Sequence, residues 1–369
     1  MSETANRPHR IRVAMPMLNL VRGGMGGTET YARELTRELA GRPEIEFQSA
    51  VTSSAAGFTN GPELVASSIS GGDSNLARLR TQARASVSRT LRSWVRQADV
   101  VHYPFTAPVP PAPRHLPVVQ TLHDVQHLDL PQLFSKAELV YRRIMYDAPA
   151  RRAQVVITDS HFSRDRIVHH LGIDPERVRV AHLGVDTSKF TPNEGEREDF
   201  VLYPARGWAH KNHSTLIEAM HLVRREEPQL RLVLTGGALD LEDLPAWVDN
   251  RGLVSRAELI ELFRRASCLA FPSRYEGFGL PPLEAMASGC PVAAASSGSL
   301  PEICGDAAVM FDPSDAAGIA AAILEARRSR ARLTPMGLAR ARQFTWSGCA
   351  DTHIEIFHEA GRTTSRAAR

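Results

Sequence analysis

Short apolar runs rich in β-branched residues recur along this chain, and loops and helical patterns separate them. In the first half they lie at 11–18, 100–103, 118–122 and 155–158. A second series lies at 200–203, 230–234, 267–271, 291–295 and 308–311. Strands that are buried on both faces of a parallel sheet have this nearly continuous apolar composition. The pattern therefore predicts an α/β fold built from doubly wound, Rossmann-like sheets.

The length of 369 residues favours two domains, because single hydrophobic cores stop growing well below that size. The polar stretch 191–198 interrupts the strand and helix pattern and is interpreted as the linker. We expect an N-terminal domain over 1–190, a C-terminal domain over 199–350 and a final helical segment over 351–369. Ligands of such sheets bind at the carboxyl ends of the strands, so a crevice there is the expected site.

Composition excludes several classes of protein. No run of 18 apolar residues is present, so no membrane-spanning helix is expected, and the first ten residues lack a signal peptide's apolar core. The four cysteines form no metal-binding or disulfide pattern. The net charge is only +3. We expect a cytoplasmic protein with no metal site and no nucleic-acid partner.

The segment 275–289, YEGFGLPPLEAMASG, carries two carboxylates eight residues apart, Glu276 and Glu284. Pro281 suits the first position of a helix, and Gly289 suits the position just past its end. Glu276 is therefore expected in a loop and Glu284 in the first turn of a short helix. The alternative for Glu284 is that it only complements the helix dipole.

The start of that helix predicts an anion-binding site. The first N–H groups of a helix have no partner within the helix, and they attract negatively charged groups. Three residues would supply them here: Phe278, Gly279 and Leu280.

The spacing of Glu276 and Glu284 resembles the E-x7-E element of retaining GT-B glycosyltransferases, in particular those of family 4. The resemblance extends from about residue 13 to about residue 357. It implies a GT-B fold and the transfer of a sugar from a nucleotide-diphosphate donor without a cofactor or metal ion. It also implies that Glu276 positions the donor sugar and that Glu284 accepts hydrogen bonds from ribose, while the final helix crosses back to the first domain.

The resemblance assigns further residues to the site. Gly26 and Gly27 follow the first strand and would let the backbone approach the donor diphosphate closely. His123 ends the strand at 118–122 and would lie near the reacting sugar, although a lone histidine is more often structural. Lys211 matches the family lysine that binds diphosphate, whereas Arg206 is offset by one residue from the family arginine.

The identity of the substrates is less constrained. Val254 lies in the segment whose family counterpart holds the nucleobase through backbone groups. The sequence Trp208-Ala209-His210-Lys211-Asn212 is similar to a loop of many mannosyltransferases and deoxysugar transferases, which makes mannose, supplied as GDP-mannose, the first expectation. A saccharide, a glycolipid or a small molecule would be the acceptor. A nucleotide-sugar epimerase and a non-catalytic nucleotide-sugar-binding protein are the alternatives.

The segment from Arg78 to Arg96 contains six arginines and no acidic residue. Apolar side chains recur in it at spacings of three to four, which predicts one basic amphipathic helix about 30 Å long. Such a helix would bind an anionic acceptor or lie peripherally on an anionic membrane at its inner face. The alternative is an ordinary helix with a solvated arginine face.

Overall fold

The computed structural model describes residues 10–23, 25–69, 75–193, 195–237, 239 and 243–367. Contacts between Cα atoms divide the chain into two units. Unit 1 comprises Met1–Asp159, Arg164–His182 and Trp346–Arg369, and unit 2 comprises Ser160–Ser163 and Leu183–Thr345. The polar stretch 191–198, expected to link the domains, lies in unit 2 and ends in a strand.

Unit 1 is built on a parallel sheet whose strands lie in the order β3-β2-β1-β4-β5-β6-β7. The order reverses between β1 and β4, as in a doubly wound sheet. Its strands are β1 (Ile11–Pro16), β2 (Ile45–Thr52), β3 (Glu63–Ala66), β4 (Val100–Tyr103), β5 (Val118–Thr121), β6 (Val155–Thr158) and β7 (Val178–Val180).

Unit 2 contains a second parallel sheet with the order β10-β9-β8-β11-β12-β13, which reverses between β8 and β11. Its strands are β8 (Glu198–Pro204), β9 (Arg231–Thr235), β10 (Val248–Asn250), β11 (Ala266–Phe271), β12 (Val292–Ala295) and β13 (Val309–Phe311). The predicted α/β fold with two doubly wound sheets is therefore confirmed.

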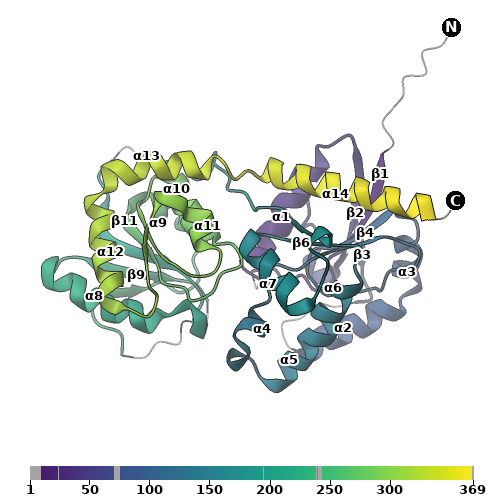
Figure 1. Cartoon of the computed structure of the whole chain (residues 1–369), viewed down its shortest axis with the longest axis horizontal. Helices are drawn as coiled ribbons and strands as arrows, with labels where there is room; N and C mark the ends of the chain where they lie inside the picture. The colour runs from purple at the N-terminus through teal and green to yellow at the C-terminus, as the bar shows by residue number, and fades with distance from the viewer. Residues whose placement is uncertain are drawn as a thin grey trace, which may run out of the picture. The chain divides into compact units, whose positions relative to one another are not determined.

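Helices connect the strands of both sheets (Figure 1). The helices of unit 1 are α1 (Gly27–Ala40), α2 (Asn75–Val87), α3 (Arg89–Val95), α4 (Gln126–Asp129), α5 (Lys136–Arg142), α6 (Ala148–Arg152) and α14 (Trp346–Ala367), with short turns η1 (Ser53–Ala55), η2 (Pro131–Leu133), η3 (Arg143–Asp147) and η4 (Pro175–Arg177). Helix α7 (His161–Leu171) begins in residues that are counted with unit 2. Unit 2 itself holds α8 (His213–Glu226), α9 (Arg256–Arg265), α10 (Leu280–Ala287), α11 (Leu300–Cys304), α12 (Ala316–Arg328) and α13 (Arg330–Ala341), with η5 (Ala209–Lys211) and η6 (Gly305–Ala307).

Four strands were not expected from the sequence, namely β2, β3, β7 and β10. Three of them, β3, β7 and β10, lie at sheet edges, where one side lacks a neighbouring strand. These three strands are short and partly exposed, so they lack the continuous apolar run used to find the others. Strand β2 also lacks a continuous apolar run, because Glu46 and Gln48 lie among its apolar residues.

The C-terminal helix α14 packs on unit 1, along α1 and against β1 (Figure 1). The hydroxyl of Tyr31 in α1 and Nε2 of His353 in α14 are 2.8 Å apart. A Cβ atom on Gly361 would lie 3.0 Å from Cδ1 of Ile11, so the helix approaches β1 closely at that point. Unit 1 therefore combines the two ends of the chain in one core.

The expected single basic helix over Arg78–Arg96 is wrong. Two helices, α2 and α3, occupy this segment, and Ser88 separates them by accepting a hydrogen bond from the amide of Leu91. The recurring apolar residues of this segment were expected to be buried, but two of them, Leu79 and Val87, are exposed, whereas Ala85 is buried. Serine at this position is a strong helix N-cap, and that local preference starts a new helix. Among the described residues, no helix is long and apolar enough to cross a membrane.

Candidate active site

The reversal of strand order in unit 2 brings the loops that follow β8 and β11 together. Nζ of Lys211, after β8, lies 2.6 Å from Oε1 of Glu276, after β11. Both side chains are largely shielded from solvent. The carboxyl ends of strands at such a switch point are the usual place for ligands in open α/β sheets. A hydrogen bond between charged groups in this setting is stronger than one between neutral groups.

Asn212 connects the loop after β8 to the loop after β11 by hydrogen bonds. It adopts a left-handed backbone conformation with φ of 62°, which asparagine tolerates better than most residues. Its side-chain amide donates to the carbonyl of Pro272 at 3.1 Å and to that of Pro313 at 2.7 Å. The amide of Arg274 also donates to the carbonyl of His210 at 2.8 Å. Hydrogen bonds thus connect the backbone segments next to Lys211 and Glu276.

Serine hydroxyls bind the backbone carbonyls of the loop that follows Glu276. Ser299 Oγ donates to the carbonyl of Phe278 at 2.7 Å, and the amide of Ser299 donates to that of Glu276 at 3.1 Å. Ser160 Oγ donates to the carbonyl of Gly277 at 2.7 Å. In a trans peptide the C=O and the following N–H point in opposite directions. The loop amides are therefore turned away from the serines.

Two glycines allow this loop conformation. Gly279, the N-cap of α10, has φ of 104°, and Gly298 has φ of 60°. A Cβ atom on Gly298 would lie 2.7 Å from both the backbone nitrogen and the backbone oxygen of Glu276. Only glycine fits there, because real Cβ atoms do not approach backbone atoms so closely.

Glu284 does not lie in the first turn of its helix, where the sequence predicted it. Helix α10 begins at Leu280 rather than at Pro281, so Glu284 is its fifth residue and not part of the first turn. A helix-dipole role is therefore weak, since that effect fades beyond the first turn. Glu284 is only 4% exposed, and Arg256, the first residue of α9, donates to its carboxylate at 2.7 Å. Burial raises the pKa of Glu284, and the Arg256 charge opposes that shift.

Helix α10 ends where the sequence predicted, just before Gly289. Ser288 is the C-cap, and Gly289 follows with φ of 66°. The amide of Gly289 donates to the carbonyl of Met286, and the amide of Cys290 donates to that of Ala285. These two bonds form a Schellman motif, the termination that a glycine past a helix end predicts.

Arg206 and Val254 both lie in loops of unit 2, Arg206 after β8 and Val254 after β10. The guanidinium carbon of Arg206 lies 5.5 Å from the ring centre of the exposed Trp208, and Trp208 stacks on His210. Val254 is half-buried and precedes Ser255, whose hydroxyl accepts from the amide of Glu258 and caps α9. The loop holding Val254 therefore leads directly into the helix that carries the partner of Glu284.

His123 lies in unit 1, two residues after β5. Its Nδ1 lies 2.8 Å from Oδ2 of Asp159, which follows the adjacent strand β6. The ring of Tyr31 meets the imidazole edge-on at 5.0 Å. Burial opposes protonation of His123, but the charge and hydrogen bond of Asp159, with Asp124 nearby, outweigh it and raise its pKa. A hydrogen bond to the backbone of Pro104 also raises the pKa of His123.

The glycine loop of unit 1 lies at the start of α1. Gly26 is the N-cap with φ of 59°, and Gly27 is the first helical residue. Glu29 accepts from the amide of Gly23 at 2.8 Å and pairs with Arg33 at 3.0 Å. The Glu29 carboxylate therefore connects the backbone before α1 to the first turns of that helix.

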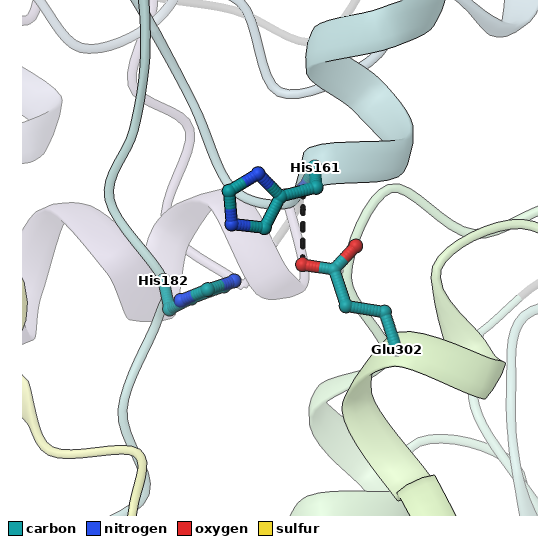
Figure 2. Close-up of side chains that lie close together, drawn as sticks. All are labelled: His161, His182 and Glu302. Atoms are coloured by element: carbon teal, nitrogen blue, oxygen red, sulfur yellow. Dashed lines mark hydrogen bonds between the residues drawn. The ribbon is translucent and has the colours of Figure 1, made fainter.

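Glu302 also has a structural role. Its two carboxylate oxygens accept from the amides of His161 and Phe162, at 2.9 and 3.0 Å, and so cap the start of α7 (Figure 2). His182, also drawn, is counted with unit 1.

Three features of the site were not predicted from the sequence. Asp159 follows strand β6, so the strand-end rule that selected His123 would have found it. Arg256 carried no signal, because nothing in the sequence pairs it with Glu284. The serines that bind the Glu276 loop were also missed, since they come from distant segments: Ser160, Ser163 and Ser299.

Two doubly wound parallel sheets, one in each unit, are the arrangement of a GT-B fold. Two family models support this. "Glycosyltransferase Family 4" matches residues 25–189, and "Glycosyl transferases group 1" matches residues 185–337. The chain is therefore a family 4-like glycosyltransferase.

Relatives with assigned activities include mannosyltransferases. The O-antigen chain mannosyltransferase B of Escherichia coli is 28% identical over 364 residues, covering 90% of this chain and 95% of that protein. The MMP alpha-(1->4)-mannosyltransferase of Mycolicibacterium hassiacum is 31% identical over 230 residues, covering 57% of this chain and 55% of that protein.

Solved structures share the fold at lower identity. Sucrose-phosphate synthase of Thermosynechococcus elongatus has a TM-score of 0.74 at 18% identity, covering 95% of this chain and 99% of that one. HepE of Anabaena, solved with UDP and glucose, has a TM-score of 0.72 at 19% identity, covering 95% and 100%.

Proposed function

We propose that this protein transfers mannose from a nucleotide-diphosphate donor to a hydroxyl of a saccharide, glycolipid or small-molecule acceptor, with retention of configuration and without a metal ion. The observation that carries the proposal is the pair formed by Lys211 and Glu276 at the switch point of unit 2. It combines a cation for the diphosphate with a carboxylate for sugar hydroxyls.

The roles of the unit 2 residues follow from their chemistry. Charge develops on the diphosphate as the bond to the sugar breaks, and preorganised donors stabilise that charge best. Lys211 and the amides of Phe278 to Leu280 would supply such donors, with Arg206 as a further cation. Glu276 would position the sugar. Glu284 would accept from ribose, and Val254 would lie at the nucleobase.

In unit 1, His123 would orient the transferred sugar or support its developing positive charge. The bond to Asp159 sets the ring orientation for either role. Gly26 and Gly27 would allow the backbone to approach the diphosphate. Support for mannose comes from the two mannosyltransferases named above. D-inositol 3-phosphate glycosyltransferases, such as that of Corynebacterium efficiens at 29% identity over 252 residues, also resemble this chain.

A panel of nucleotide sugars, read by thermal shift, tests the donor. A ligand that binds only the folded state raises the free energy of unfolding by about 2.7 kcal/mol at one hundred times its Kd. GDP-mannose should stabilise the protein more than GDP-fucose, UDP-glucose or UDP-N-acetylglucosamine at equal concentration. A larger shift with a UDP-sugar would overturn the choice of mannose.

Product analysis separates the alternatives. A glycosylated acceptor with the anomeric configuration of the donor supports retaining transfer. An isomerised donor, formed without any acceptor, would identify an epimerase. Tight donor binding without any product, across saccharide and glycolipid acceptors, would favour a binding protein.

A further inference from the structure

The core of unit 1 contains a chain of hydrogen-bonded polar side chains. Four of them are each 0% exposed and come from different elements: Tyr31 of α1, His102 of β4, Thr121 of β5 and His353 of α14. Burying a polar group is unfavourable unless that group forms hydrogen bonds. Here the bonds run from one residue to the next across the four elements. We call these four residues the Tyr31 network.

The bond between Tyr31 and His353 has a definite direction. Nδ1 of His353 lies 2.7 Å from the carbonyl oxygen of Cys349, and a carbonyl only accepts, so Nδ1 carries the hydrogen. Burial lowers the pKa of His353 to about 4, so the ring is uncharged near neutral pH and its Nε2 is an acceptor. The hydroxyl of Tyr31, 2.8 Å from that Nε2, is therefore the donor.

The directions of the other two bonds follow from this one. Because the single hydroxyl proton of Tyr31 goes to His353, Thr121 must donate to the Tyr31 oxygen, 3.0 Å away. The Thr121 oxygen then has only lone pairs left, so Nε2 of His102 donates to it at 2.9 Å. The proton positions of all three bonds are thus fixed. A buried network that is ordered in this way favours one arrangement of its members.

The Tyr31 network lies beside His123. The ring planes of Tyr31 and His123 are 85° apart, with 5.0 Å between the ring centres. Thr121 is the last residue of β5, two positions before His123. Asp159 binds Nδ1 of His123, and the Tyr31 ring packs against the same imidazole. The orientation of His123 therefore depends on the position of Tyr31 as well as on Asp159.

His353 connects this arrangement to the other end of the chain. It lies 322 residues from Tyr31 in sequence, on the helix α14 that packs along α1 (Figure 1). Its ring also packs against the rings of His102 and Phe357, with centres 5.5 and 6.0 Å away. A leucine or a phenylalanine would fill such a position without the cost of burying polar atoms. The feature that only the histidine supplies is the acceptor for the Tyr31 hydroxyl.

We propose that Tyr31 and His353 are positioning residues for His123. His353 would hold the Tyr31 hydroxyl, and the Tyr31 ring would in turn hold the imidazole of His123 in the orientation that the reaction needs. The C-terminal helix would thereby contribute to turnover through His123. The effect on turnover rests on the proposed glycosyl transfer, in which His123 acts on the transferred sugar.

Substitutions at His353 test the proposal. His353→Leu keeps an apolar side chain and removes the acceptor, so it should lower kcat about fivefold, the loss expected for one hydrogen bond. The KM for the donor should change little. His353→Gln supplies a side-chain oxygen that accepts from Tyr31, and it should restore most of the wild-type kcat. Tyr31→Phe keeps the ring and removes only the hydroxyl, so it should resemble His353→Leu.

A double-mutant cycle separates positioning from general stability. In a His123→Gln background, His353→Leu should have almost no further effect on kcat, because the residue that it positions is already replaced. Ile356→Val is the matched control, since Ile356 is 0% exposed in the same helix and lies outside the network. It should lower the melting temperature and leave kcat unchanged.

Nuclear magnetic resonance of isotope-labelled histidine gives a readout that does not depend on the reaction. The imidazole signal of His123 is identified by its loss in His123→Gln. That signal should shift or broaden in His353→Leu and should match the wild type in His353→Gln and Ile356→Val. Such a shift in a protein that transfers no sugar would refute the proposed function while supporting the positioning of His123.

Two outcomes would overturn the proposal. One is a His123 signal that stays unchanged in His353→Leu, whatever the reaction proves to be. The other is an additive loss of kcat in the double-mutant cycle, because His353 would then act independently of His123. If His353→Leu fails to fold, the same two measurements on Tyr31→Phe decide.

Discussion

The proposed binding of the donor diphosphate depends mainly on Lys211. Lys211→Ala should lower kcat/KM by roughly 10- to 150-fold, the equivalent of one charge-assisted hydrogen bond of about 1.5–3 kcal/mol. The matched control is Arg206→Ala, which removes a cation that lies against the exposed Trp208 and should cost less. Steady-state kinetics on both variants gives the comparison. A greater loss with Arg206→Ala would reassign the diphosphate to that arginine.

Glu284→Gln should weaken nucleotide-diphosphate binding about tenfold, because a neutral amide accepts hydrogen bonds from ribose less strongly than a carboxylate does. Stability should hardly change, since Arg256 is half-exposed and loses a partner rather than becoming a buried charge. Calorimetric titration with nucleotide and a thermal melt measure both quantities. Unchanged affinity in the folded variant would exclude the ribose role.

His123→Gln should lower kcat strongly and leave nucleotide affinity nearly intact, because the side chains proposed to bind the nucleotide, those of Lys211, Arg206 and Glu284, lie in unit 2. Turnover, affinity and melting temperature are measured on the same variant. A purely structural histidine would instead lower the melting temperature and activity together.

The raised pKa of His123 gives this prediction a second readout. A group whose pKa is raised on folding stabilises the protein below its unfolded pKa, and that stabilisation is lost as pH rises through the folded pKa. The wild type should therefore lose more stability than His123→Gln as pH rises from about 6.5 upward. Equal pH dependence in the two proteins would contradict the pairing with Asp159.

At the scale of elements, the loop between β11 and α10 depends on the close approach of Gly298. Gly298→Ala would place a methyl group 2.7 Å from the Glu276 backbone and force that loop to move. We expect a loss of stability of about 1–3 kcal/mol and a loss of activity that exceeds the unfolded fraction. Chemical denaturation and kinetics measure the two effects.

Gly172→Ala is the control for this prediction. Gly172 has φ of 62°, close to the 60° of Gly298, but nothing lies within 4 Å of the Cβ position. It therefore reproduces the backbone strain without the steric clash. Equal effects of the two substitutions on activity would show that the Glu276 loop tolerates displacement.

For the whole molecule, the proposed metal independence makes a direct prediction. Lys211 and the amides at the start of α10 would neutralise the leaving diphosphate, so activity should survive excess EDTA. Initial rates with EDTA, with added magnesium and with added manganese test it. Full loss with the chelator and recovery with either ion would replace this mechanism with a metal-assisted one.

The sequence by itself determined the class of fold and the positions of the central strands. Strands such as β4, β6 and β12 are buried on both faces, and burial on both faces requires the continuous apolar runs that sequence inspection detects. Local chemistry also placed the end of α10, because Gly289 can adopt the backbone conformation that terminates a helix. Motif resemblance selected Lys211 and Glu276 as candidates.

Only the tertiary structure decided which side chains meet. Arg256 reaches Glu284, Asp159 reaches His123 and Ser299 reaches the Glu276 loop, each across sequence separations that no local pattern encodes. The same holds for α2, whose outer face exposes Leu79 and Val87. Amphipathic spacing indicates that a helix has an apolar side, but the neighbouring elements decide which side is buried. Contacts distant in sequence depend on the packing of the sheets and helices, and that packing is a property of the folded chain.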